Sequence, residues 1–181
     1  VFSSSSKILE INSKTGLYPL YVTYSIYCQR RNDYVVNDLI DDVNNYSVEE
    51  EHVIWDDVVM DNIFVVCNTP MAARITERTL FVFFFHANTI SAKRHIKVEK
   101  LIEQAMTDPN ALIAKLKSEG FWNGTTSKKD MRFNAVVGNP PYQIKQDATS
   151  DDPIYHIFMQ IGYQLSDKAS FITPARFLFN A

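Results

Sequence analysis

An asparagine, two prolines and a tyrosine follow directly on an apolar run, in the stretch "VVGNPPYQ" that starts at Val136. Proline has no N–H for a β ladder, so a buried strand over 133–137 has to end there. The first proline also disfavours helical angles at Asn139, and two fixed φ angles hold the loop in one shape. The backbone carbonyls of such a loop lack ladder partners and can face a ligand.

These residue types suit the binding of an amino group on a planar ring. The amide oxygen of Asn139 and the carbonyl of Pro140 are two hydrogen-bond acceptors, which match the two N–H donors of an amine. Tyr142 offers a flat face on which the ring can stack. The lone pair of the amine then points outward, which suits attack on an electrophilic carbon. An ordinary turn is the alternative interpretation.

The same stretch resembles the catalytic motif of amino-methyltransferases that use S-adenosylmethionine, best known among the adenine-N6 DNA methyltransferases. "FNAVVGNPPYQ" and "PIYHIFMQIGYQLSDKASFITPARFLFNA" look like the methylase part of type II restriction-modification enzymes that combine the restriction and the methylation activity in one chain. "VVCNTPMAARITERTL" and "KLKSEGFWN" are similar to the same group, so the resemblance extends over most of residues 7–181. It implies methyl transfer to N6 of an adenine that is flipped out of double-stranded DNA. The catalytic residues that it implies are Asn139, Pro140, Pro141 and Tyr142.

The resemblance also indicates where S-adenosylmethionine would bind. In the family an acid and a glycine-rich turn follow the first strand, and the matching run here is "EINSKTG". In the family the second strand normally ends in an acid that accepts hydrogen bonds from the cofactor ribose. Cys67 stands at about that point here, and Asn68 could replace the acid as an acceptor. The cofactor-binding residues implied in this way are Glu10, Asn12, Gly16, Asn68 and Asn139. Glu99 is the acid nearest to the adenine-binding position after the third strand.

Two other functions stay open on the residues alone. Similar Asn-Pro-Pro-Tyr loops serve methylation of glutamine amides in proteins and of bases in RNA. A degenerate methyltransferase fold that only binds is the second alternative, because Lys14 stands where a glycine is common and Cys67 where an acid is usual. We expect Cys67 to be a small buried hydrophobe.

The elements that would position these loops alternate between strands and helices, which indicates βαβ units and a parallel sheet. Strands are expected at 7–12, 63–67, near 95–98, 133–137 and 169–173. Helices are expected at 17–29, at 47–60 behind a capping box, after Thr69-Pro70, at 101–116 with a break near 108–109, and from 152–153 to 165. We expect a polar loop at 120–130 and a helix cap at Asp151-Asp152. The fold class is therefore α/β, resembling a Rossmann-like class I S-adenosylmethionine-dependent methyltransferase with flanking helices.

Composition fits one domain without a membrane span or a metal site. The chain has 181 residues, of which 46% are hydrophobic. No apolar run approaches the roughly 18 residues of a membrane span, and the longest, Leu80–Phe85, is expected to be a buried strand or helix end. Two cysteines and the absence of a signal peptide indicate a cytoplasmic protein. The four histidines have no metal-ligand spacing with the cysteines.

Charge is unevenly distributed along the chain, although the net charge is only −3. Between Asn32 and Ala73 there are ten acids and no Lys or Arg, so the basic residues lie elsewhere, where a polyanion could meet them. The simpler interpretation makes 38–61 the solvated face of surface helices.

We expect 1–181 to be a partial methyltransferase domain that is truncated before its last strands. Its parts would be a cofactor loop near 8–16, an acidic helical insert at about 33–61 and a catalytic loop at 138–143. An open sheet edge would favour self-association.

Overall fold

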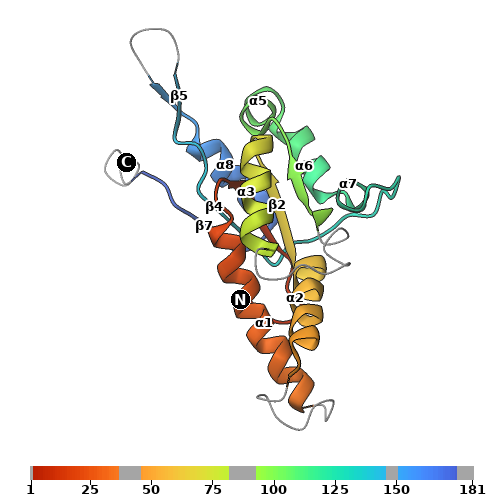
Figure 1. Cartoon of the computed structure of the whole chain (residues 1–181). Helices are drawn as coiled ribbons and strands as arrows, with labels where there is room; N and C mark the ends of the chain where they lie inside the picture. Colours follow the sequence, from red (N-terminus) through yellow and green to blue (C-terminus); the bar gives the residue numbers. More distant parts are fainter. Residues whose placement is uncertain (1, 37–45, 82–92, 146–150, 175–181) are drawn as a thin grey trace.

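Five parallel strands form the central sheet of the computed structural model, which describes residues 2–36, 46–81, 93–145 and 151–174 (Figure 1). Their order is β3-β2-β1-β4-β7, and every neighbouring pair is parallel. The strands are β1 (Ile8–Ser13), β2 (Ile63–Cys67), β3 (Ile96–Val98), β4 (Ala135–Gly138) and β7 (Ala169–Phe171). The predicted α/β fold with a mainly parallel sheet is confirmed.

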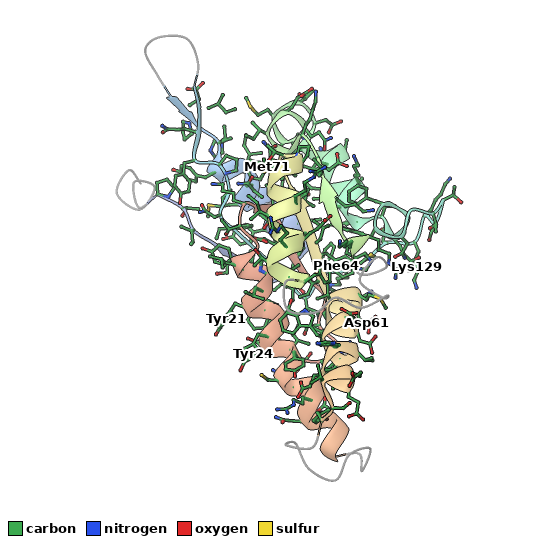
Figure 2. The ribbon with its side chains drawn as sticks, in the orientation of Figure 1. Tyr21, Tyr24, Asp61, Phe64, Met71 and Lys129 are labelled. Atoms are coloured by element: carbon green, nitrogen blue, oxygen red, sulfur yellow. The ribbon has the colours of Figure 1, made fainter. Side chains whose placement is uncertain are left out.

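Helices cover both faces of the sheet. One face carries α1 (Leu17–Val36), α2 (Val48–Asn62) and α3 (Pro70–Phe81). The other carries α5 (Leu101–Thr107), α6 (Pro109–Lys117), α7 (Glu119–Asn123) and α8 (Tyr155–Leu165). Each face encloses its own hydrophobic core, so the inner strands are buried on both sides, as parallel strands usually are. Tyr21 and Tyr24 project from the side of α1 that faces away from the sheet (Figure 2).

Three helix boundaries confirm their sequence signals. Ser47 and Glu50 form the predicted capping box of α2, with each side chain bonded to the backbone N–H of the other. The Thr69 hydroxyl accepts the N–H of Ala72 at 3.2 Å at the start of α3. Asp108 separates α5 from α6 and caps the latter, since its carboxylate accepts the N–H of Ala111 at 2.9 Å.

The boundary between α1 and the acidic region differs from the prediction. Helix α1 does not end at Gln29 but continues to Val36, because it packs along α2 (Figure 1). Ion pairs join the two helices, from Arg30 to Asp61 at 2.9 Å and from Arg31 to Glu51 at 2.7 Å.

The acids of the region are not all on a solvated face, because Asp56 is only 1% exposed. Helix α2 buries Trp55 and Val58 in the core, so it is part of the domain rather than a surface appendage. Residues 37–45 lie outside the described part of the chain.

Two segments differ from the prediction: part of the expected polar loop at 120–130 is helical, and the expected helix cap at 151–152 is part of a strand. The polar loop at 120–130 begins inside α7, where Trp122 is buried and its indole N–H donates to the Leu116 carbonyl at 2.8 Å. Asp151 and Asp152 do not cap α8. They belong to β6 (Asp151–Pro153), which pairs antiparallel with β5 (Gln143–Lys145) in a hairpin that projects from the domain (Figure 1).

The apolar run Leu80–Phe85 begins as a buried helix end. Leu80 and Phe81 close α3 and are buried, whereas 82–85 lie outside the described residues. Within the described ranges, no helix has the length and apolar character needed to cross a membrane.

Candidate active site

The strand order places a topological switch point between β1 and β4. From β1 the chain builds outward through β2 and β3, then returns to the other side of β1 with β4 and β7. In open α/β sheets, ligands bind in the crevice beyond the carboxyl ends of the two strands at such a point. The two loops singled out in the sequence leave β1 and β4 there, so the structure brings them together.

The end of β1 is shaped by Asn12. This residue has φ 66°, in the left-handed region that Asn tolerates better than most side chains. The pairing with β2 shifts register between Ile11 and Ser13, so Asn12 leaves the ladder. Its buried side chain turns toward β4, where Nδ2 donates to the backbone carbonyl of Asn139 at 2.8 Å. The loops that follow β1 and β4 are therefore hydrogen-bonded to each other.

The side-chain oxygen of Asn139 is a hydrogen-bond acceptor that no described donor uses. Its Oδ1 atom is buried and accepts no hydrogen bond from any described residue. A buried acceptor without a donor costs stability, and natural proteins keep few of them. The backbone oxygen of the same residue is already bonded to Asn12. Asn139 thus presents one open acceptor at the switch point, next to the buried Pro140.

Tyr142 lies at the base of the β5–β6 hairpin. Its carbonyl accepts the N–H of Ile154 at 3.0 Å, which closes the hairpin and fixes the backbone of the tyrosine. The side chain is 38% exposed, so one part of it is accessible to a ligand. Pro141, which precedes it, is half-buried. The hairpin explains how the chain can leave the Asn-Pro-Pro-Tyr loop and still return to α8.

Glu10 supplies a buried carboxyl group below the cofactor loop. Its Oε2 atom has no hydrogen-bond partner among the described residues. Burial raises its pKa from the ordinary 4.5 to about 7, against a smaller lowering by a hydrogen bond from Ser13. A cationic or N–H-bearing group beside this carboxyl would favour its charged form.

Helix α3 holds the rest of the cofactor loop. The hydroxyl oxygens of Ser13 and Thr76 are 3.0 Å apart, and Thr79 donates to the Thr15 carbonyl at 2.7 Å. Gly16 has φ +75°, and a β-carbon there would lie 2.9 Å from the Cα of Thr76. Packing against α3 therefore accounts for this glycine. Only the "TERT" spacing, which puts Thr76 and Thr79 on one helix face, hinted at this contact.

The remaining residues singled out in the sequence lie at the carboxyl ends of β2 and β3. Cys67 is fully buried, as expected, and burial raises its thiol pKa to about 11. Asn68, directly after β2, is half-buried. Glu99, after β3, is held by Lys115 at 2.6 Å and Gln104 at 2.9 Å. No group of three or more His, Cys, Asp or Glu in the described ranges is arranged to hold a metal ion.

The sheet order, with its switch point between β1 and β4, defines a Rossmann-like α/β domain. A family model, the Eco57I restriction-modification methylase, matches residues 61–181, about two thirds of the chain. The matched part contains the Asn-Pro-Pro-Tyr loop. The chain belongs to this family. The match begins after β1, so it does not include the cofactor loop. A search of curated proteins found no match.

Proposed function

We propose that this chain carries the methyl-transfer site of a DNA methyltransferase that modifies N6 of adenine in a restriction-modification system. Membership of the methylase family supports the reaction class. The observation that supports an amino group as the acceptor of the methyl group is the vacant, buried Oδ1 of Asn139. This oxygen would accept one N–H of the adenine amino group, and the Pro140 carbonyl would accept the other.

The target base would have to leave the duplex to reach this pocket. Flipping an adenine costs a few kcal/mol, which contacts in the pocket have to offset. Tyr142 is exposed enough to stack on the base, while the hairpin hydrogen bond to Ile154 holds its backbone still. With the amino group held at two acceptors and the ring on Tyr142, the residues contribute chiefly positioning and polarisation of the amine.

The loop after β1 fits S-adenosylmethionine as the methyl donor. When bound, this cofactor supplies the methyl group from its sulfonium. The Glu10 carboxyl, whose Oε2 has no hydrogen-bond partner among the described residues, suits its positively charged amino group, and a cation there would favour the ionised carboxylate. The side chain of Lys14, which stands where a glycine is common in the family, is exposed. The residues that would hold the cofactor are Glu10, Asn12, Gly16, Asn68 and Asn139.

The experiment offers the natural protein three kinds of substrate with tritium-labelled S-adenosylmethionine. DNA, RNA and a glutamine-containing protein are incubated in parallel, and the label is counted in each. We expect label in double-stranded DNA alone. Label in RNA or in protein would overturn the proposed substrate. Failure to bind S-adenosylmethionine in a calorimetric titration would instead indicate a binding scaffold.

A further inference from the structure

We infer that Asn12 is a positioning residue, which sets the orientation of the Asn139–Pro140 peptide for methyl transfer. The inference rests on the proposed function, because it concerns the same loop. It assigns Asn12 a role toward the substrate loop, in addition to any contact with a cofactor.

The local geometry of Asn12 directs its side chain toward the backbone carbonyl of Asn139. The residue is 5% exposed, has φ 66° and stands at the register shift that ends pairing between β1 and β2. A left-handed conformation is unfavourable for most residues that have a β-carbon, and Asn tolerates it better than most. In this conformation Nδ2 donates to the Asn139 carbonyl at 2.8 Å, across 127 positions of sequence.

The accepting carbonyl makes this contact consequential. It belongs to the peptide plane between Asn139 and Pro140, so the donor constrains the orientation of that plane. The ring of Pro140 fixes its φ angle, and Pro141 restricts its ψ angle to extended values, so the direction of the Pro140 carbonyl follows from the same plane. The Pro140 carbonyl, one of the two acceptors that the amino group requires, is oriented in this way. The hydrogen bond also occupies the backbone oxygen of Asn139 and leaves Oδ1 as its open acceptor.

The loop that carries Asn12 is itself held by helix α3, so the hydrogen bond to Asn139 (the tether) starts from a fixed point. Ser13, next to Asn12, is bonded to Thr76 at 3.0 Å, and Thr15 is bonded to Thr79 at 2.7 Å. Helix α3 therefore holds the loop from which Asn12 reaches β4. A donor on an anchored loop can position its acceptor, whereas a donor on a free loop would follow it.

Two substitutions and one matched control test the role. Asn12→Gly keeps the left-handed conformation and removes the donor, while Asn12→Asp keeps the shape and replaces the donor by an oxygen. The control is Asn134→Ala. Asn134 joins the same two strands at their opposite ends, where its Oδ1 accepts the N–H of Lys7 at 2.8 Å.

In the natural protein we expect both Asn12 variants to lose about tenfold or more in kcat, since small misplacements of reacting groups are costly. KM for DNA should stay within about threefold, because the lost interaction acts on positioning. Asn134→Ala should keep the wild-type kcat. A kcat for Asn12→Gly equal to that of Asn134→Ala would overturn the inference, whether both variants keep the wild-type kcat or both lose it.

Hydrogen exchange gives a readout that does not depend on activity. Asn12→Gly should speed amide exchange in residues 138–145 and leave 63–67 unchanged, whereas unchanged exchange in 138–145 would overturn the tether. A wild-type protein that methylates no DNA would instead overturn the proposed function, and the exchange result would still decide the role of Asn12.

Discussion

A β-carbon added to Gly138 would lie 2.4 Å from the carbonyl oxygen of Ile11. The two residues are register partners in neighbouring strands, near the points where β1 and β4 lead into the loops that we propose to bind the cofactor and the target base. Their close approach places Asn139 within reach of Asn12. The glycine before the Asn-Pro-Pro-Tyr loop is therefore required by strand packing.

Gly138→Ala should destabilise the fold by about 1–3 kcal/mol, because the added methyl group overpacks a rigid backbone contact. Urea denaturation measures the change. Gly124→Ala is a useful control, since Gly124 has φ +67° and a β-carbon added there would have no described atom within 4 Å. It should show only the conformational cost, about 1 kcal/mol. A Gly138→Ala protein as stable as the wild type would show that the strands can separate freely.

The Glu10 carboxyl should make stability fall as pH rises from 4.5 to 7. Its pKa is about 7 in the folded protein and 4.5 ordinarily, so in this window the folded state keeps a proton that the unfolded chain has released. The full effect is up to about 3 kcal/mol, reached above pH 7. Glu10→Gln should remove it and be more stable than the wild type at pH 8. Parallel stability–pH curves for the two proteins would contradict the buried carboxyl.

Tyr142→Ala should weaken binding of DNA with an unpaired target adenine more than binding of normal duplex. Stacking of a base on an aromatic ring contributes about 1–3 kcal/mol. Fluorescence titration with both DNAs measures the difference. Tyr163→Ala is the control, because Tyr163 lies on α8 and is 60% exposed. Equal losses on both DNAs would count against a stacking platform.

Strand β7 forms one end of the described sheet order, with β4 as its neighbour. An uncovered strand edge can pair with another chain. We therefore expect the 181-residue chain to associate with itself in solution, in a concentration-dependent way that light scattering would detect. A monomer at all concentrations would contradict this prediction.

Local signals in the sequence predict much of the fold. Pro140 and Pro141 end a strand by their chemistry, and the caps at Ser47 and Thr69 start helices because their hydroxyls satisfy free N–H groups. "DDP" carries the same kind of helix-start signal, yet it forms β6. A tertiary hydrogen bond between Tyr142 and Ile154 accompanies the hairpin there, and no local pattern contains it.

The candidate site divides in the same way. The Asn-Pro-Pro-Tyr loop could be located from sequence, because its residue types and its place after an apolar run are both local. The bond from Asn12 to Asn139 could not, because it joins residues 127 positions apart and depends on the strand order. The burial of Asp56 is of the same kind, since it depends on how α2 packs in the domain.

Methylation of adenine by an Asn139 variant tests the central claim most directly. The natural protein, Asn139→Ala and the Asn134→Ala control are each incubated with DNA and S-adenosylmethionine, and nucleosides are then quantified by mass spectrometry. We predict N6-methyladenine from the wild type and the control, and a rate lowered by well over about tenfold, or more than 1.4 kcal/mol, in Asn139→Ala. A rate for Asn139→Ala within about tenfold of the wild type, or a methyl group found on another atom, would contradict the account.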